Sequence, residues 1–199
     1  GQVHALASGL AAATGELVAI CDADTFYPPE YLARAQAILD AAPDMVAACA
    51  WPRDGAGRGW KSALNRLHRL AAFRLLPWQN HVGGPSQCFR AAALRASGGY
   101  DAAIWPYVLK DQELMHRVLR LGRQGFDARH WCQPSARRAD RRAVRWTLAE
   151  RLRYHLTGAA GQRAFFHDWL APRLAARGAR DTALRAQPWQ ADQLSSNTA

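Results

Sequence analysis

An apolar run that ends in two carboxylates is the feature of this chain that most constrains its fold. Residues 17–20 (Leu-Val-Ala-Ile) carry only apolar side chains, and Asp22 and Asp24 follow closely. A short apolar run is typical of a buried strand, and alternate side chains of an extended segment point to the same side. We therefore expect both carboxylates at the end of a strand, where open α/β sheets bind their ligands.

Two converging carboxylates suit a hard divalent cation. Mg²⁺ and Mn²⁺ prefer oxygen ligands, and Mg²⁺ is often held by one or two protein carboxylates together with phosphate oxygens and water. The pair therefore predicts a metal-assisted phosphate or diphosphate site. The alternative for any Asp-x-Asp is that one residue caps the following helix and the other is solvated in a loop.

Helical and extended patterns alternate over the first two thirds of the chain, which predicts an α/β fold. Strands are expected over residues 17–21 and 44–51, with a short strand within 83–90. The helices are expected over residues 4–14, 30–41, 60–76, 91–96 and 109–121. Because the chain opens in the middle of a βαβ unit, we expect further strands upstream of residue 1.

Two segments are amphipathic and basic. In the helix expected over 60–76, one side carries Leu64, Leu67, Ala71 and Leu75. We expect that side to pack on the protein, with a membrane or an acceptor as the alternative. From residue 137 the chain is arginine-dense around an apolar stripe, and a further helix is expected over 162–177. The expected divisions are a sheet domain over 1–135, a basic helical appendage over 136–186 and a disordered tail over 187–199.

The composition narrows the classes of protein without choosing one. The net charge of +10 favours anionic partners, namely nucleic acid, anionic lipid or phosphorylated substrates, although a GC-rich genome also enriches arginine. Apolar runs fall short of the ~18 residues of a membrane helix, and the start lacks signal-peptide features. The four cysteines are widely spaced, which argues against a zinc site or a redox pair. We expect a cytoplasmic protein with reduced thiols.

Four segments in order resemble the family 2 glycosyltransferases of the GT-A fold. They are G-Q-V-H-A-L at 1–6, D-A-D-T at 22–25, F-R followed by G-G-Y-D at 89–101, and D-Q-E-L with a later L-G at 111–122. The resemblance covers about residues 1 to 130. It implies a GT-A-like (Rossmann-like) mixed sheet with flanking helices that lacks its first strands. The chain is then an N-terminally truncated part of such an enzyme, and we expect it to bind donor poorly on its own.

The resemblance implies an inverting transfer of a sugar from a nucleotide-diphosphate donor to an acceptor hydroxyl. Asp111 would be the general base that deprotonates the acceptor. Asp24, together with Asp22, would hold Mg²⁺ or Mn²⁺ against the diphosphate.

The resemblance also assigns residues around the reacting groups. Gln2 and His4, with Asp22, would face the donor. Gly83, Gly84 and Lys110 are the candidates on the acceptor side. Lys110 stands where the family usually has Glu, so we expect its positive charge to lower the basicity of the adjacent base.

For Glu113, two positions after the base, we expect a place on the helix surface. The family often acts on lipid-linked acceptors, so the expected acceptor is lipid-linked or a polysaccharide, with peripheral contact at the inner face of the membrane and no nucleic acid. Two alternatives remain open from the residues. One is a phosphatase of the haloacid dehalogenase type, which also begins with a strand and D-x-D. The other is a basic module that binds a membrane surface or nucleic acid through the arginine-rich helix.

Overall fold

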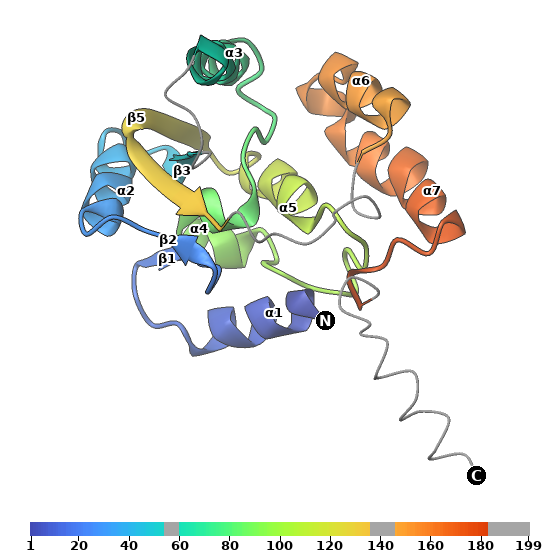
Figure 1. The fold of residues 1–199 in the computed structure, drawn as a ribbon. Coiled ribbons are helices and arrows are strands. Elements are labelled where there is room, and N and C mark those ends of the chain that lie inside the picture. The colour runs from blue at the N-terminus through green and yellow to red at the C-terminus, as the bar shows by residue number, and fades with distance from the viewer. Residues whose placement is uncertain (54–59, 136–145, 183–199) are drawn as a thin grey trace.

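The computed structural model, which describes residues 1–53, 60–135 and 146–182, contains a five-stranded mixed sheet with the strand order β1-β4-β3-β5-β2 (Figure 1). The strands are β1 (Leu17–Ala19), β2 (Thr25–Phe26), β3 (Met45–Pro52), β4 (Gln87–Arg90) and β5 (Arg123–Pro134). β3 and β5 pair in parallel, and the other neighbours pair antiparallel. This confirms the expected α/β class with a mixed sheet.

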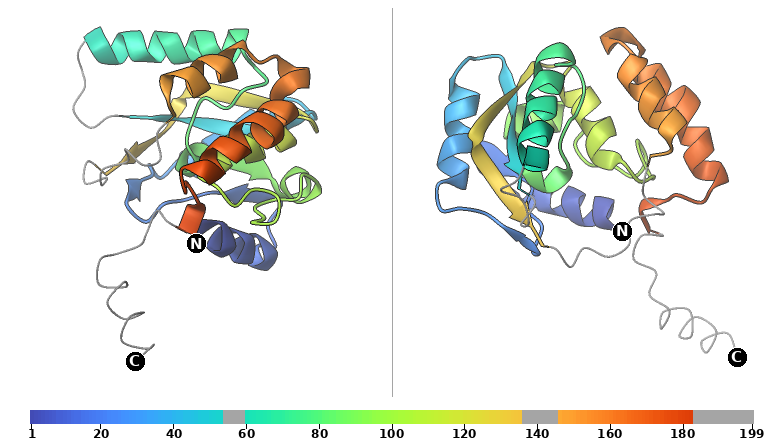
Figure 2. Two further views of the ribbon diagram at one scale, coloured as in Figure 1. Left: turned by 90° about the vertical axis from the view of Figure 1, so that its right-hand side faces the viewer. Right: turned by 45° about the horizontal axis from the view of Figure 1, so that its top comes forward.

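Helices cover both faces of the sheet (Figure 2). The helical elements are α1 (Gln2–Ala12), α2 (Tyr31–Asp40), α3 (Trp60–Leu75), the 3₁₀ turn η1 (Gly84–Ser86), α4 (Ala91–Ala96), α5 (Lys110–Val118), α6 (Leu148–Leu156), the 3₁₀ turn η3 (Ala159–Gly161), the π-helix η4 (Ala164–Leu170) and α7 (Ala171–Ala176). Every helix expected from the sequence within these ranges is present, with ends that differ by a few residues. The ends differ most at α5, which stops at Val118 because residues 119 and 120 form a turn.

Alternation along β3 builds the core on both sides of the sheet. Ala48 packs with Leu39 of α2 on one face, whereas Ala47 and Cys49 pack with Leu114 of α5 on the other. Successive side chains of a strand point to opposite faces, so a strand buried on both sides is apolar throughout. This is why β3 could be predicted from its composition.

β5 is the main element that the sequence did not predict. Its twelve residues include Arg123, Gln124, Asp127 and Arg129, and they show neither an apolar run nor regular alternation. The strand is defined by pairing in parallel with β3, with register shifts along it. β2, a strand of only two residues, pairs with the far end of β5. Both strands depend on partners distant in sequence rather than on local composition.

The C-terminal helices form a second apolar cluster beside α5. Trp105 and Val108 of the loop before α5 pack with Phe166, Leu170 and Leu174. Thr147 caps α6 through a reciprocal pair of hydrogen bonds with Glu150, which is a capping box. The arginine-dense residues 137–145, the expected tail 187–199 and most of the glycine-rich loop at 52–59 lie outside the described residues.

α3 is turned the opposite way from the expectation. Phe73 packs against the sheet by stacking on Phe126 at 4.7 Å between ring centroids, while Leu64, Leu67 and Leu75 are exposed. The prediction that the leucine side packs on the protein is therefore wrong. None of the helices in the described ranges has the length and apolar character needed to cross a membrane.

His130 makes the stability of the fold depend on pH. Its side chain on β5 is fully buried against Tyr31, and within the described residues neither ring nitrogen has a hydrogen-bond partner. Burial lowers the pKa of His130 to about 4, so the ring is neutral in the fold. The unfolded chain has a histidine pKa of about 6.5, so stability is complete above that pH and falls as the pH drops toward 4.

We predict that His130→Phe, which removes this titration, reduces the loss of stability between pH 7 and pH 5 by about 1–2 kcal/mol. Urea unfolding at the two pH values measures the difference. His4→Gln, which changes an exposed histidine on α1, is the control and should keep the wild-type dependence. An unchanged dependence in His130→Phe would contradict the prediction.

Candidate active site

Asp22 and Asp24 lie in a tight turn between β1 and β2. The amide of Thr25 donates to the carbonyl oxygen of Asp22 at 3.1 Å, which closes the turn. Asp22 is half-buried and Asp24 is exposed. The expectation of an extended segment is therefore wrong at this point, because Ala23 and Asp24 belong to the turn. It is the turn that brings the two aspartates to one edge of the sheet.

Tyr27 connects this turn to η1. Its hydroxyl accepts a hydrogen bond from the amide of Asp22 at 3.0 Å and donates one to the carbonyl oxygen of Pro85 at 3.1 Å. Burial raises the pKa of Tyr27 well above its ordinary value, so the phenol keeps its proton and remains a donor. The position of Asp22 is thus fixed relative to the Gly84–Ser86 turn.

The same turn holds Asp111. The amide of Gly84 donates to Oδ2 of Asp111 at 2.9 Å. A Cβ atom at Gly84 would lie 2.6 Å from Oδ1 of Asp111, so a side chain there would collide with the carboxylate. Asp111 is in the first turn of α5, whose preceding residue Leu109 has a left-handed φ of 63°. Such a backbone is unfavourable for leucine, and strain of this kind is often found at functional sites.

Tyr100 lies under both acidic groups. Its side chain is buried, and burial raises its pKa well above the ordinary value, with the negative charges of Asp111 and Asp22 raising it further. One buried phenol is therefore within the electrostatic reach of both carboxylates. The structure brings Asp22 and Asp111, about 90 residues apart in sequence, to the same site.

The side chain of Lys110 interacts with Gln2 of α1 and with Asp181. Its ammonium donates to Oε1 of Gln2 at 2.9 Å and lies 3.3 Å from Oδ1 of Asp181. The other oxygen of Asp181 accepts from the amide of Val3 in the first turn of α1, at 2.9 Å. His4 is exposed on the same helix. Sequence reasoning missed Asp181, because nothing local marks an acid 70 residues away as the partner of Lys110.

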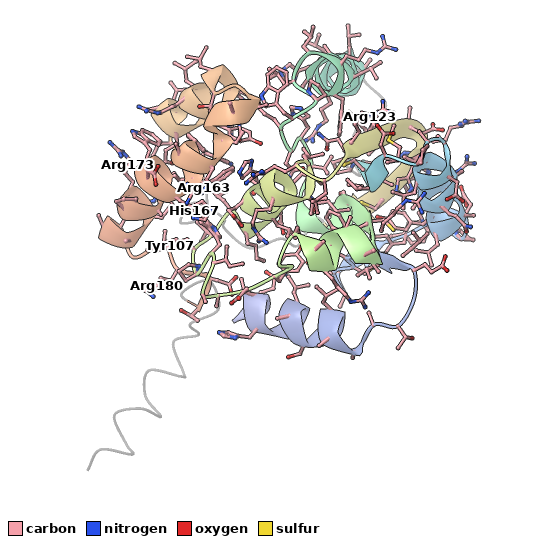
Figure 3. The ribbon with its side chains drawn as sticks, turned by 180° about the vertical axis from the view of Figure 1, so that it is seen from behind. Tyr107, Arg123, Arg163, His167, Arg173 and Arg180 are labelled. Atoms are coloured by element: carbon pink, nitrogen blue, oxygen red, sulfur yellow. The ribbon has the colours of Figure 1, made fainter. Side chains whose placement is uncertain are left out.

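Glu113 is buried, and the prediction that it lies on the helix surface is wrong. It is fully buried and accepts hydrogen bonds from Arg117 at 2.9 Å and from His167 of η4 at 3.1 Å. His167 is labelled in Figure 3. Burial raises the pKa of Glu113, but the bonds to His167 and Arg117 outweigh it, and the pKa is lowered. Arg117 also donates to the carbonyl oxygen of Gly99 at 2.8 Å. Glu113 therefore links α5, the glycine turn before it and the C-terminal helices.

α6 supports the segment that leads into η1. Gln79 donates to the carbonyl oxygen of Tyr154 at 2.7 Å, and the amide of Asn80 donates to the Tyr154 hydroxyl at 2.8 Å. The side chain of Asn80 donates to the carbonyl oxygen of Asp111 at 3.2 Å. The C-terminal helices therefore help to position the residues around Asp111.

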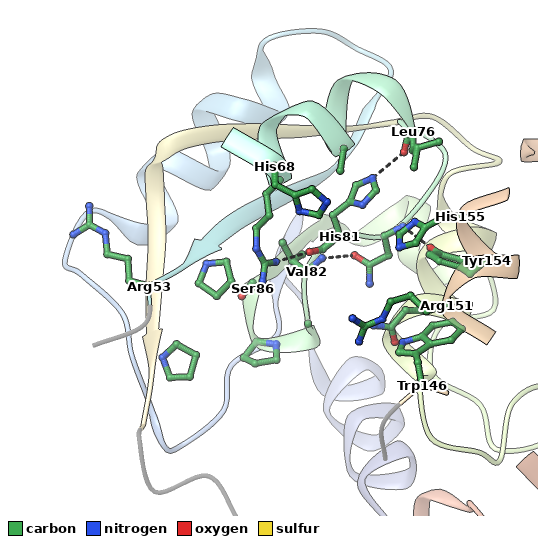
Figure 4. Close-up of a pocket in the computed structure, with 18 of the residues that line it drawn as sticks. Arg53, His68, Leu76, His81, Val82, Ser86, Trp146, Arg151, Tyr154 and His155 are labelled. Carbon is green, nitrogen blue, oxygen red and sulfur yellow. Dashed lines mark hydrogen bonds between the residues drawn. The ribbon is translucent and has the colours of Figure 1, made fainter. Parts of the chain in front are cut away.

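A cleft of about 1750 Å³ opens beside these groups (Figure 4). Asp24, Gly83 and Gln112 line it, so it runs from the turn between β1 and β2 to the start of α5. Its wall also carries basic groups from several elements. These are Arg53, His68, Arg69, Arg151 and His155. The positive charges of Arg53, Arg69 and Arg151 favour an anionic ligand.

Asp22 and Asp24 are the residues that could hold a divalent cation. In the described part of the chain, no three His, Cys, Asp or Glu side chains are grouped as a metal site. Two carboxylates still fit a Mg²⁺ or Mn²⁺ ion whose other ligands are phosphate oxygens and water. Such an ion would bind together with a phosphorylated ligand rather than in a cage made of protein alone.

Known proteins resemble this chain in sequence over its first half and in fold. Residues 1–97 match the family model described as glycosyl transferase family 2. A mannosyltransferase from Pyrobaculum calidifontis, solved in complex with GDP-Man and Mn²⁺, is similar over 100% of this chain, with 22% identity and a TM-score of 0.56. TarS from S. aureus is similar over 82% of this chain, with 17% identity and a TM-score of 0.50. A search of curated proteins returned no match.

The fold is that of the GT-A glycosyltransferases, as these structures show. The chain is similar to glycosyl transferase family 2 over its first 97 residues, just under half of its length. It spans 59% of the length of the mannosyltransferase and 29% of that of TarS. The family match favours a transferase over the phosphatase that also begins with a strand and D-x-D.

Gly84 and Gly83 offer a matched test of how Asp111 is positioned. We predict that Gly84→Ala displaces the Asp111 carboxylate and lowers the rate of the sugar transfer proposed below by about 100-fold, because misplacement of a reacting group by about 1 Å has an effect of this size. Gly83→Ala should have little effect, since a Cβ there meets only Pro85, at 3.9 Å. Transfer rates, with thermal unfolding to confirm folding, measure both variants. Equal rates in the two variants would contradict the prediction.

Proposed function

We propose that this chain is the acceptor-side part of an inverting glycosyltransferase that uses a nucleotide-diphosphate sugar, a divalent cation and Asp111 as general base. The observation that carries the proposal is the η1 turn. Gly84 contacts Asp111 and Pro85 contacts Tyr27, which is bonded to Asp22. Asp24 and Pro85 line one cleft together with Gln112, the residue after Asp111, so the proposed cation site and the proposed base lie at or next to its wall.

The chemistry that we assign to Asp111 follows from its place next to Gln112, which lines the cleft. In the proposed step the acceptor oxygen forms a bond to the anomeric carbon of the donor, and the bond from that carbon to the diphosphate oxygen breaks. The proton of the acceptor hydroxyl passes to the Asp111 carboxylate. The hydrogen bond from the Gly84 amide orients that carboxylate and leaves its second oxygen to accept the proton.

Asp22 and Asp24 would hold the cation at the other end of the cleft. When bound, the cation would neutralise charge on the departing diphosphate. The mannosyltransferase that shares the fold was solved with GDP-Man and Mn²⁺, which supports this choice of ligand and ion. We further propose that Gln2 and His4, on α1, face the donor. Since Gln2 is bonded to Lys110, it also joins the donor side to the helix that carries the base.

For the acceptor we propose a lipid-linked molecule or a polysaccharide, bound in the cleft that Gly83 lines, with Gly84 and Lys110 on the elements next to it. The basic wall of the cleft supports an acceptor that carries negative charge. We propose a location in the cytoplasm at the inner face of the membrane. We also propose residues 1–135 as the catalytic part and 136–186 as a helical appendage that supports it through Tyr154 and His167.

Asp111→Asn tests the proposed base. The amide keeps an oxygen for the Gly84 hydrogen bond but cannot accept the acceptor proton, so we expect transfer to fall by about 10²–10⁴-fold with donor affinity retained. The assay offers a panel of nucleotide-sugars with Mg²⁺ or Mn²⁺ to the longest polypeptide that the gene encodes. Asp40→Asn, at an exposed carboxylate paired with Arg90, is the matched control. Transfer that survives in Asp111→Asn would rule out this base.

Asp24→Ala tests the proposed cation site. We predict that it weakens donor binding in the presence of Mn²⁺ and has little effect when the ion is removed with EDTA, since the carboxylate acts through the ion. Calorimetric titration of nucleoside diphosphate, with and without Mn²⁺, measures the difference. Equal weakening in both conditions would show that Asp24 acts without a metal.

A further inference from the structure

The exposed leucines of α3 and α6 form two rows at one end of the molecule. Six leucines on these helices are between 57% and 83% exposed, and they make up most of the large apolar side chains that are exposed in the described ranges. They are Leu64, Leu67 and Leu75 on α3, and Leu148, Leu152 and Leu156 on α6. Single exposed leucines are ordinary, whereas rows of them on neighbouring helices usually mark a contact surface.

The spacing of each row matches one side of its helix. Leu148, Leu152 and Leu156 are four residues apart, and on the opposite side of α6 Glu150 and Tyr154 are buried. In α3 the leucines lie opposite Phe73, the residue that packs on the sheet. Each helix therefore already uses its other side to bind the protein. The leucine rows are left for a partner.

The charges on these helices indicate what kind of partner it is. α3 contains no acidic residue in its sequence. The single acid of α6, Glu150, is buried and lies 3.0 Å from Arg177. Arg74 on α3 and Arg151 and Arg153 on α6 are exposed. The two helices thus present leucine and arginine together, without an exposed carboxylate.

Figures 1 and 2 show α3 and α6 at the same end of the molecule. Residues of both helices line the cleft. His68 and Leu75 of α3 and Arg151 and His155 of α6 line that cleft (Figure 4). A flat partner that covers both rows would therefore also lie against the entrance to the cleft.

We propose that α3 and α6 form a membrane-docking surface, in which the six leucines enter the interface of a lipid bilayer and the arginines contact anionic headgroups. Amphipathic helices with arginine on the polar side bind membranes in this way, and each arginine near an anionic surface contributes about 1 kcal/mol. A second copy of this chain fits less well, because pairing the rows would bring like charges together. The surface needs neither donor nor cation, so it does not rest on the proposed transfer reaction.

Binding to lipid vesicles tests this surface. The full chain is mixed with vesicles of phosphatidylcholine alone, or of phosphatidylcholine with phosphatidylglycerol, and the bound fraction is measured by sedimentation. The wild type should bind the anionic vesicles, and salt should weaken that binding. The double variant Leu67→Gln and Leu152→Gln should bind about tenfold or more weakly, because it lacks two leucines that the wild type buries in the bilayer.

Leu32→Gln is the matched control, because Leu32 on α2 is 61% exposed and Leu67 is 62% exposed. It should bind like the wild type. No binding to anionic vesicles, equal binding to neutral vesicles, or unchanged binding by the double variant would each overturn the proposal. So would self-association without vesicles that the double variant abolishes, since the rows would then join two copies. None of these outcomes bears on sugar transfer, which is measured separately.

Discussion

The hydrogen bond from the Gly84 amide to Asp111 is the contact on which the site depends. It joins the start of α5 to the η1 turn, and through Pro85 and Tyr27 it reaches the turn that carries Asp22. Because a Cβ atom at residue 84 would meet the carboxylate at 2.6 Å, the close approach requires glycine. One short turn thus sets the distance between two acidic groups that come from opposite ends of the sheet domain.

The C-terminal helices support this arrangement through hydrogen bonds to its residues. Tyr154 of α6 holds Gln79 and Asn80, and His167 of η4 reaches the buried Glu113. A buried carboxylate is favourable only when it is paired, and Arg117 and His167 both serve that purpose. Arg117 also donates to the carbonyl oxygen of Gly99, the residue before Tyr100. The ion pair of Arg117 with Glu113 therefore helps to position the buried Tyr100.

Sequence reasoning found the parts of the fold that local composition determines. The apolar β3 and the helices with regular apolar spacing were predicted, whereas a shared site for the acidic turn and Asp111 stays a prediction. β5 was missed because its residues are mixed in polarity and its state depends on pairing with β3. Glu113 was misjudged because a charged residue in a first helical turn gives no sign of being buried. The orientation of α3 was also wrong, since periodicity identifies an apolar side but not what that side contacts.

The Asp181 carboxylate, near the C-terminal end of the described chain, contacts both α1 at the N-terminal end and Lys110 of α5. One of its oxygens lies 3.3 Å from the buried ammonium of Lys110, and the other accepts from the amide of Val3. Without that carboxylate, Lys110 would be an enclosed cation next to the proposed base, and the first turn of α1 would lose its cap. The integrity of α1 and the charge balance behind α5 are therefore secured by a residue that folds into place only after both helices have been synthesised.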